Sequence, residues 1–356
     1  MDKAALRVQL EATYKWLIRS FEQTGWQGSA HSYSYWLNGN AGWAEAYPET
    51  TGYILETLQQ YQEQMGGKPI CELIIQQANW LTTIAQTNGS YLSGRYQPYL
   101  SKQPSIFNSG QILFGLMTGY KMNKDQKYLT QIQKTVSWLL DAREKDGSWT
   151  QWGWRNSSSP AYYSRVIWPI LLSSQLLGQF QDIKQVLAPT IIFYRQLLLP
   201  NGTFEHWGFE KDKSAFTHTI AYTLRGWLEI YRLTKDPNIY HLLQHSLQSL
   251  MKRIRKEGRL AGAYDNDWQG DFSFICVTGH LQLSIVFYLW YEMVEDESFM
   301  ALSISLFQQV FPYINNKKHR GGIPGSIPFY GKYNPLRYPN WAAKFFMDYG
   351  LMVLKE

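Results

Sequence analysis

The sequence predicts an all-α fold in which six helical hairpins form two concentric rings of helices. Two observations support this prediction. A glycine followed by an aromatic residue recurs along the chain at nearly constant spacing, and each copy separates an amphipathic helix from a more apolar one. The 356 residues are 16% aromatic and only 17% charged, which argues against a disordered chain or a long coiled coil. Because the repeat runs through the whole chain, we expect residues 1–356 to form one domain.

The glycine–aromatic repeat is clearest at four positions. Gly89, Gly147, Gly202 and Gly262 each precede an aromatic residue by two positions, and they are separated by 58, 55 and 60 residues. A stretch with helical spacing of apolar residues comes before each glycine, and a polar, aromatic loop comes after it. The loop then leads into a second, more apolar helix, so that each repeat predicts one helical hairpin.

The second helices also align with one another, because Thr-Gly, Ser-Gly or related pairs recur just inside them. These pairs are 51–52, 109–110, 164–165, 217–218 and 278–279, with a weaker one at 343–344. The second helices are apolar on all sides, which is typical of buried helices, and we place them in the inner ring. No run of strand-like alternation competes with this pattern, so we expect no parallel sheet. The twelve predicted helices span 3–22, 49–64, 70–87, 106–122, 126–143, 160–178, 182–197, 216–234, 238–255, 272–294, 297–312 and 340–354.

The loop lengths predict where a functional site lies. Links from an inner to the next outer helix are short, whereas links from an outer to an inner helix are long, and long loops in compact proteins are usually functional. All six long loops gather at one face, where the inner helices begin. That face also collects six helix N-termini, whose partial positive charge favours anions. The long loops are 23–48, 88–105, 144–159, 198–215, 256–271 and 313–339.

Charge and composition exclude several classes of protein. The net charge is +6, but the basic clusters 252–256 and 317–320 fall at predicted helix ends, where the helix dipole explains them, so we expect no nucleic-acid partner. No apolar run approaches the roughly 18 residues of a membrane span, and the N-terminus lacks the layout of a signal peptide, which favours the cytoplasm. Two cysteines exclude a disulfide scaffold and a four-cysteine zinc site. We expect no metal and no cofactor, and the sequence predicts no particular oligomeric state.

The repeated helix, glycine, aromatic and helix units resemble the (α/α)6 toroids, which include six-hairpin glycosidases, toroid polysaccharide lyases and the squalene-cyclase and protein-prenyltransferase group. Residues 138–149 and 80–91 look like the repeat of that last group. The strings 43–53, 217–222, 264–268 and 338–346 together resemble a bacterial family of toroid proteins associated with exopolysaccharide biosynthesis. This resemblance implies a role in polysaccharide assembly or modification, and it implies no mechanism.

Two glutamates precede the first inner helix. Glu45 and Glu49 alternate with Trp43 and Tyr47 in the loop that leads into it. Glu49 follows Pro48 at a predicted helix start, where the helix dipole alone favours an acidic residue. The dipole does not explain why Trp43, Glu45 and Tyr47 lie beside it. We therefore treat both glutamates as candidate catalytic acids that face the mouth of the toroid.

Three inner-ring positions carry charged or titratable residues where other repeats have glycine. Arg165, His218 and Lys344 are equivalent to Gly52, Gly110 and Gly279. A charge inside a buried helix is costly unless it is paired or faces a wet cavity. We expect a polar cavity with these three side chains on its floor, and pairing with buried carboxylates is the alternative. Glycine at the other repeats would leave room for a ligand, although close helix packing would also select it.

Two catalytic sets remain open. Glycoside hydrolysis needs one protonated and one ionised carboxyl, which Asp265, Asp267 and Glu205 could supply with Glu45 or Glu49. A uronate lyase or epimerase needs a base and a group that neutralises the carboxylate. His218, Tyr222 or Tyr330 would serve as the base, and Arg165 or Lys344 would neutralise the carboxylate.

The long loops are unusually rich in aromatic residues. Tyrosine and tryptophan beside polar groups bind the partly apolar faces of sugars, although some of these rings must pack the loops together. The candidate substrate contacts, beyond Arg165 and Lys344, are Trp43, Tyr47, Trp149, Trp152, His206, Trp207, Trp268, His280, Tyr330 and Trp341.

We therefore expect a carbohydrate-active protein that binds an oligosaccharide or polysaccharide, with an acidic glycan favoured, as a lyase or epimerase first and a hydrolase second. An isoprenoid cyclase or prenyltransferase is one alternative. However, the string 265–268 lacks the last aspartate of the cyclase acid motif. A prenyltransferase would need zinc, and a zinc site at Asp271, Cys276 and His280 would use a cysteine that we expect in the core. A non-catalytic glycan-binding toroid is the other alternative.

Overall fold

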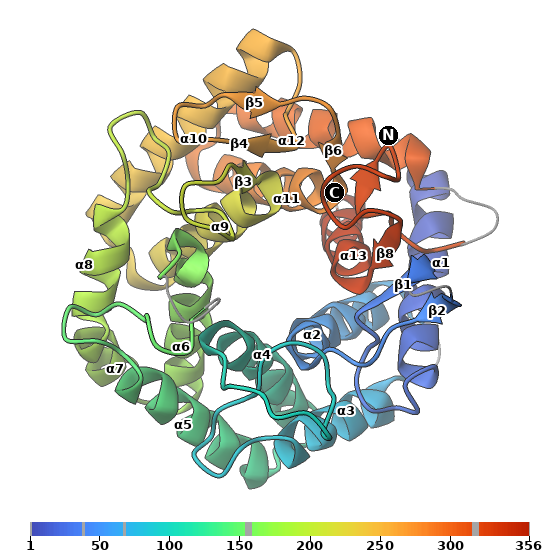
Figure 1. Ribbon diagram of the computed structural model, residues 1–356, viewed down its shortest axis with the longest axis vertical. Coiled ribbons are helices and arrows are strands. Elements are labelled where there is room, and N and C mark those ends of the chain that lie inside the picture. The colour runs from blue at the N-terminus through green and yellow to red at the C-terminus, as the bar shows by residue number, and fades with distance from the viewer. Residues whose placement is uncertain (1, 38–39, 67–68, 154–158, 315–319, 356) are drawn as a thin grey trace.

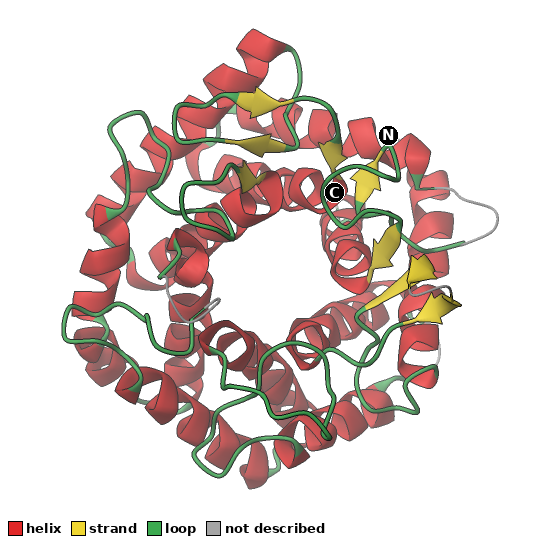
Figure 2. Cartoon of the chain, viewed as in Figure 1, coloured by secondary structure: helices red, strands yellow, loops and turns green. Residues whose placement is uncertain are grey.

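The structure is a computed structural model that describes residues 2–37, 40–66, 69–153, 159–314 and 320–355. Helices dominate these residues, and the strands are short (Figures 1 and 2). The helices are α1 (Lys3–Glu22), α2 (Pro48–Met65), α3 (Cys71–Thr83), α4 (Ile106–Asn123), α5 (Gln126–Asp141), η2 (Ala161–Tyr163), α6 (Ser164–Leu176), α7 (Phe180–Val186), α8 (Ala188–Gln196), α9 (Thr217–Thr234), α10 (Pro237–Glu257), α11 (Val277–Val294), α12 (Glu297–Val310), η3 (Phe311–Tyr313) and α13 (Asn340–Leu354). The strands are β1 (Ser32–Leu37), β2 (Asn40–Trp43), β3 (Ala215–Phe216), β4 (Ala263–Tyr264), β5 (Gly270–Asp271), β6 (Ile275–Cys276), β7 (Ser326–Ile327) and β8 (Arg337–Pro339).

The helices form two concentric rings around a central axis (Figure 1). Each inner helix contacts the next in the order α2, α4, α6, α9, α11 and α13, and α13 contacts α2, so the inner ring is closed. The remaining helices form the outer ring, and α1 packs against α13, which brings the first and last helices side by side. The predicted all-α (α/α)6 toroid is confirmed.

The two kinds of helix differ in burial as the sequence predicts. In the inner helix α11 every residue from Val277 to Trp290 is buried. In the outer helix α5 the buried residues, which include Tyr128, Ile132 and Leu139, recur every three or four positions on one face. No helix in the described part of the chain is long and apolar enough to cross a membrane.

Several helix boundaries differ from the prediction, and α3, for example, ends at Thr83 instead of residue 87. The predicted helix 182–197 is divided into α7 and α8, because Pro189 has no backbone N–H to donate to the turn before it. The predicted helix 272–294 begins only at Val277, since Ile275 and Cys276 pair with Ile327 and Ser326 as strands.

Within the described residues, the segments before the inner helices contain three small antiparallel sheets, which the all-α prediction did not include (Figure 2). Their strand orders are β2-β1-β8, β3-β4-β5 and β6-β7. The pairing of β1 with β8 joins loop 23–48 to loop 313–339, and the pairing of β3 with β4 joins loop 198–215 to loop 256–271. The loops above the inner ring are therefore cross-linked by backbone hydrogen bonds.

The glycines of the repeat pairs allow neighbouring inner helices to approach closely. A Cβ atom on Gly52 would lie 2.6 Å from the backbone oxygen of Gln111, and one on Gly279 would lie 2.1 Å from Thr217 Oγ1. A Cβ atom on Gly110 would lie 3.0 Å from a methyl group of Val166. Close packing of the inner ring, rather than room for a ligand, therefore explains these glycines.

This packing predicts the effect of Gly52→Ala. Helix propensity alone would favour alanine by about 1 kcal/mol. We expect the variant instead to lose about 1–3 kcal/mol of unfolding free energy, because the methyl group meets the α4 backbone, which cannot rotate away. Denaturant unfolding followed by circular dichroism measures the change.

Gly42→Ala is the matched control, since a Cβ atom there would meet nothing within 4 Å. We expect its unfolding free energy to match that of the original chain. A Gly52→Ala protein as stable as this control would contradict the account of ring closure.

Candidate functional site

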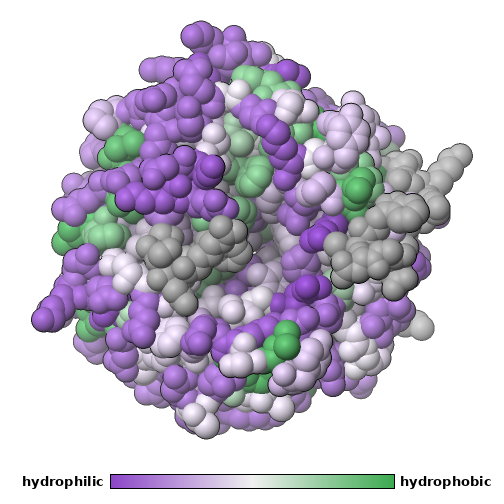
Figure 3. Space-filling view, viewed as in Figure 1, coloured by the Kyte–Doolittle hydropathy of each residue, from purple (hydrophilic) through white to green (hydrophobic). Residues whose placement is uncertain are grey.

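A cavity of about 810 Å³ lies in the face of the toroid where the long loops gather. We call this face the loop face, and its surface is mostly hydrophilic (Figure 3). Five of the six long loops contribute to the lining, and loop 256–271 contributes none. The lining residues are His31, Tyr47, Glu49, Tyr53, Ser93, Gly94, Arg95, Ser101, Lys102, Gln103, Pro104, Ser105, Phe107, Asn108, Trp152, Gly153, Tyr162, Tyr163, Phe209, His218, Tyr222, Tyr333, Asn334 and Trp341.

The beginnings of the inner helices supply one layer of this lining. Glu49, Phe107 and Trp341 are the second residues of α2, α4 and α13, and Tyr162 is the second residue of η2 just before α6. All four occupy the same position in the repeat, two residues before the aligned pairs, and all four line the cavity. In four of the six repeats this position therefore faces the cavity, whereas the equivalent residues Ala215 and Cys276 are buried and do not line it.

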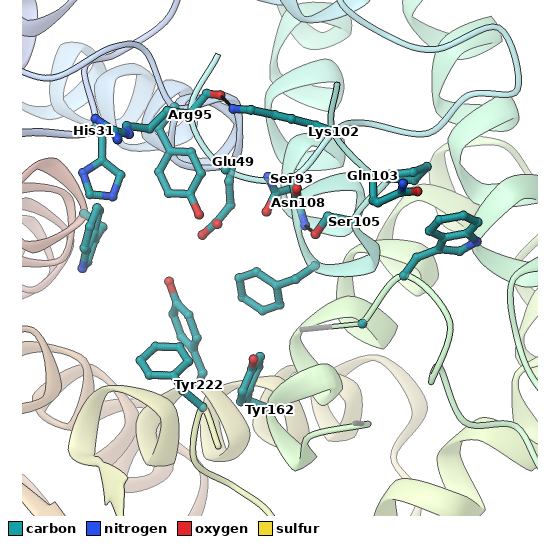
Figure 4. A pocket seen from close by; sticks show the side chains of 18 of the residues that line it. His31, Glu49, Ser93, Arg95, Lys102, Gln103, Ser105, Asn108, Tyr162 and Tyr222 are labelled. Carbon is teal, nitrogen blue, oxygen red and sulfur yellow. Dashed lines mark hydrogen bonds between the residues drawn. The ribbon is translucent and has the colours of Figure 1, made fainter. Parts of the chain in front are cut away.

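Glu49 is the carboxyl group of this layer, and Figure 4 shows its side chain pointing into the cavity. Its side chain is 7% exposed, and burial raises the pKa of Glu49 to about 7. The hydroxyl groups of Tyr47 and Tyr53 and the charge of Arg165 oppose this rise only in part. A carboxyl group with a pKa near 7 both donates and accepts protons at neutral pH, as general acid–base catalysis requires.

Two histidines share the cavity. His218 Nδ1 lies 2.7 Å from Gln282 Nε2, and its ring lies 4.2 Å from the ring of Tyr222. The ring of His31 lies between Tyr47 and Trp341, at 5.0 Å and 4.7 Å. Burial lowers the pKa of both histidines to about 3, with a smaller effect of nearby arginines. Both rings are therefore neutral at pH 7 and contribute hydrogen bonds rather than charge.

Two cations from loop 88–105 line the opening. Arg95 forms an ion pair with Glu45 at 2.5 Å, and the Tyr96 amide donates to Ala46 O at 2.7 Å, so this loop is fixed to the segment before α2. Lys102 donates to the Arg95 carbonyl oxygen. Burial and the charge of Arg95 lower the pKa of Lys102. Figure 4 shows Arg95 and Lys102 on one side of the cavity, with Tyr162 and Tyr222 opposite.

Some of the predicted site residues meet in this cavity. Glu45 lies at its edge, paired with Arg95. Those that line it are Tyr47, Glu49, Trp152, His218, Tyr222 and Trp341.

The predicted floor of Arg165, His218 and Lys344 is wrong for two of the three residues. Arg165 and Lys344 line a different cavity on the opposite side of the inner ring, and only His218 lines the loop-face cavity. Arg165 and Lys344 are 2% and 6% exposed, and Lys344 is paired with Asp348 of its own helix. Tyr53 lines both cavities, so it forms part of the wall between them.

Several predicted sugar-binding aromatics pack the loops instead. Trp149 is fully buried, and its indole N–H donates to Leu139 O at 2.8 Å. Trp207 and Trp268 are buried edge to face against each other, with ring centres 5.4 Å apart. Trp43 packs on Trp16 at 4.6 Å. These rings and the exposed Tyr330 are not among the lining residues of the cavity.

The acidic residues of the other long loops also lie outside the lining. Asp265 accepts hydrogen bonds from the amides of Asp267 and Gln269, which closes a turn. Glu205 and Asp267 are exposed. His206 is in the same loop as Glu205, and its carbonyl oxygen accepts from the Ala161 amide at 3.0 Å, so its backbone supports the start of α6.

The possible zinc ligands do not form a site. His280 is fully buried, and its ring contacts Cys276 O and Gln309 of α12, which turns it away from the loop-face cavity. Asp271 is paired with Lys332 at 2.5 Å. Among the described residues, no group of three histidine, cysteine or carboxylate side chains could hold a metal ion.

Several lining residues are not among those predicted from the sequence. Phe107 and Tyr162 could have been found, because they occupy the repeat position of Glu49. His31, Arg95 and Lys102 lie in irregular loops, where no periodic pattern indicates which side chains face the axis.

Comparison with solved structures shows which proteins share this fold. An unsaturated glucuronyl hydrolase from a Bacillus species has a TM-score of 0.73 at 11% identity, with 99% of this chain and 96% of that chain covered. A cellobiose 2-epimerase from Bacillus thermoamylovorans has a TM-score of 0.70 at 14% identity, with 98% of each chain covered. An unsaturated glucuronyl hydrolase specific for heparin has a TM-score of 0.71 at 13% identity, with 99% and 98% covered. No protein-family model matches the sequence, and a sequence comparison with curated proteins gives no match either.

The raised pKa of Glu49 predicts a pH-dependent effect of Glu49→Gln on stability. Since the pKa rises from the usual 4.5 to about 7 on folding, ionisation of Glu49 destabilises the folded state as pH rises through this interval. The variant cannot ionise there. We compare the unfolding free energy of the variant with that of the original chain at each pH. We expect the difference, variant minus original, to increase by about 3 kcal/mol from about pH 4 to pH 8.

Glu63→Gln is the control, because Glu63 is a more exposed glutamate of the same helix. Denaturant unfolding at both pH values measures the two differences. A Glu49→Gln difference that does not change with pH would show that burial does not raise the pKa of Glu49.

Proposed function

We propose that this protein is a carbohydrate-active enzyme that transfers a proton to or from a carbon atom of an acidic sugar, with Glu49 as the group that carries the proton. The observation on which this rests is the carboxyl group of Glu49, which points into the loop-face cavity and has a pKa of about 7.

The cavity suits a sugar. Its volume of about 810 Å³ lies within the range of small-molecule sites, roughly 300–1,000 Å³. Aromatic rings such as Trp152, Tyr162 and Trp341 alternate in the lining with polar groups such as Asn108 and Ser105. This mixture complements sugar rings, which have apolar faces and hydroxyl edges. The structural neighbours, among them unsaturated glucuronyl hydrolases and a cellobiose 2-epimerase, support the same class of substrate.

The cations favour an acidic sugar. Arg95 and Lys102 line the opening, and the only carboxylate bonded to Arg95 within the described residues is the partly exposed Glu45. A uronate carboxylate next to these cations would be neutralised, which lowers the cost of removing the proton on the adjacent carbon. Arg95 and Lys102 thus take the role that the sequence analysis gave to Arg165 and Lys344.

Proton transfer at carbon fits the cavity better than glycoside hydrolysis with two carboxyl groups. Among the described residues, Glu49 is the only carboxyl that lines the cavity, whereas that hydrolysis needs a pair. In the lyase reaction, ionised Glu49 takes the proton from the carbon next to the uronate carboxylate. The bond from the adjacent carbon to the oxygen of the neighbouring sugar then breaks, a double bond forms between the two carbons, and the leaving oxygen takes a proton from water. In the epimerase reaction, a proton returns to the opposite face of the same carbon. Tyr162 and Tyr222, which lie opposite Glu49, are placed to donate it (Figure 4).

Hydrolysis of an unsaturated uronide is the second candidate, and the same carboxyl favours it. An unsaturated uronide is a vinyl ether, which a single acid activates by protonating a carbon of the double bond. Water then adds to the adjacent carbon, and the hemiketal that forms opens and releases the neighbouring sugar. A Glu49 that is still protonated near neutral pH would donate this proton.

The pH dependence of the turnover rate distinguishes the two candidates. If Glu49 acts first as a base, the rate should rise with pH through about 7, and if it acts first as an acid, the rate should fall through about 7. Glu49→Gln should lower turnover at least about 100-fold in either case, since general acid–base catalysis contributes that much, while sugar binding is retained.

The assay is incubation with acidic and neutral oligosaccharides, saturated and unsaturated. New ultraviolet absorbance indicates a lyase, loss of absorbance from an unsaturated substrate indicates the hydrolase, and solvent deuterium at carbon without cleavage indicates an epimerase. Binding without turnover would support a glycan-binding toroid instead. Binding of prenyl diphosphates but not of sugars would contradict the proposal and favour the isoprenoid alternative.

The cations at the opening predict selectivity for charge. Arg95→Ala should weaken binding of acidic oligosaccharides about 10- to 150-fold, the value of a charge-assisted hydrogen bond, and should change binding of neutral analogues much less. Calorimetric titration with matched acidic and neutral oligosaccharides measures both effects.

Arg253→Ala is the control, because Arg253 forms a comparable ion pair with Glu257 on the outer helix α10. An equal loss of affinity for acidic and neutral sugars in Arg95→Ala would contradict a charge-neutralising role.

We further propose that the reaction belongs to bacterial exopolysaccharide assembly or modification and takes place in the cytoplasm.

A further inference from the structure

A second cavity, of about 520 Å³, lies on the opposite side of the inner ring from the loop-face cavity. Charged residues line it densely, and none of them takes part in the proposed reaction. Its deep lining includes Arg165, Arg225, Lys344 and Asp348, and Tyr53 separates it from the loop-face cavity. We call it the second cavity.

Arg165 is the most deeply buried charge in this lining. It is 2% exposed, and its Nε donates to Gln111 Oε1 at 3.0 Å. Its guanidinium packs against the rings of Tyr222 and Trp168, with its central carbon 4.6 Å and 5.2 Å from their centres. Aromatic faces stabilise a cation but do not accept hydrogen bonds at its edge. Within the described residues, its terminal nitrogens have no hydrogen-bond partner and it forms no ion pair.

The neighbouring charges are paired with one another, and Asp348 stabilises the charge of Arg165 without a direct contact. Lys344 is bonded to Asp348, whose other oxygen accepts from Thr57 at 2.5 Å. Arg225 is paired with Glu229 at 2.8 Å. Across the wall, Glu49 carries only a partial charge at neutral pH, because its pKa is about 7. The lining also includes Glu56, whose charge acts on Lys344, so the charges around Arg165 mainly compensate one another.

Among the described residues, this arrangement leaves the guanidinium of Arg165 without a carboxylate in direct contact, which is costly in a low-dielectric interior. Burial lowers the pKa of Arg165, but an arginine stays protonated in proteins. An anion in the second cavity would supply a direct partner for this unbonded edge, and a guanidinium edge matches the two oxygens of a carboxylate or a phosphate.

We infer that the second cavity is a binding site for a small anion that carries a carboxylate or phosphate group, with Arg165 as its main contact and Lys344 and Arg225 as neighbouring cations. The site is separate from the loop-face cavity, and it does not depend on the proposed reaction.

The test is thermal unfolding in sodium phosphate or sodium succinate, with sodium chloride at the same ionic strength as reference, and calorimetric titration of the same two anions. We expect at least one of them to raise the unfolding midpoint, and the one that does so identifies the charged group. Arg165→Met keeps most of the side-chain volume and should lower the affinity for the anion at least about tenfold. Arg253→Met, on the outer surface, should leave the affinity unchanged.

Two further variants locate the bound anion. Arg95→Ala removes a cation of the loop-face cavity, and the anion should still raise the unfolding midpoint of this variant. If the anion no longer stabilised Arg95→Ala, it would bind in the loop-face cavity, and the inference would be overturned. Asp348→Asn removes a paired carboxylate and should strengthen anion binding, which keeps the inference testable if Arg165→Met does not fold. No stabilisation by either anion, or unchanged binding in Arg165→Met, would also overturn it.

Discussion

The close packing of the inner helices is the constraint on which the rest of the structure depends. Gly52 and Gly279 have no side chain where a Cβ atom would meet the backbone or a side chain of the neighbouring helix, and this lets the ring close at a small radius. Closure at this radius brings the helix beginnings together. In four of the six repeats it turns the same repeat position, occupied by Glu49 and Trp341 among others, toward the cavity. The cavity is thus a consequence of backbone contacts below it.

Burial within this ring also produces the chemistry of the site. The same exclusion of water that stabilises the toroid raises the pKa of Glu49 and lowers those of His31 and His218, so that the glutamate is the group that exchanges protons near neutral pH. The wall at Tyr53 separates this chemistry from a second, charged cavity. The two ends of the axis therefore present different environments, one aromatic and weakly cationic, the other densely charged.

The sequence predicted the architecture because periodic patterns report burial directly. It predicted Glu49 and Tyr47 from the alternation of acidic and aromatic residues before the first inner helix, and Tyr222 as a candidate base, and all three line the cavity. The prediction from sequence was wrong where one residue pattern is typical of both a binding site and a buried core. Trp149 is the aromatic residue of the glycine–aromatic repeat, and that position is a buried anchor in every clear copy, as Tyr91, Phe204 and Tyr264 also show.

The predicted placement of Arg165 and Lys344 on the floor of the loop-face cavity was wrong because a sequence does not report how deep a side chain lies along the ring axis. Arg165 and Lys344 line the second cavity, whereas His218, at the same repeat position, lines the loop-face cavity. The depth at which the two cavities are separated therefore differs around the ring, and it depends on side-chain packing that a single sequence does not report.

The central claim is that Glu49 exchanges its proton near neutral pH inside a sugar-sized cavity. The most direct measurement is a carbon NMR titration of the glutamate carboxyl groups, in which the signal that disappears in Glu49→Gln identifies residue 49. A midpoint of about 7 would agree with the account, and a midpoint near the usual 4.5 would contradict it.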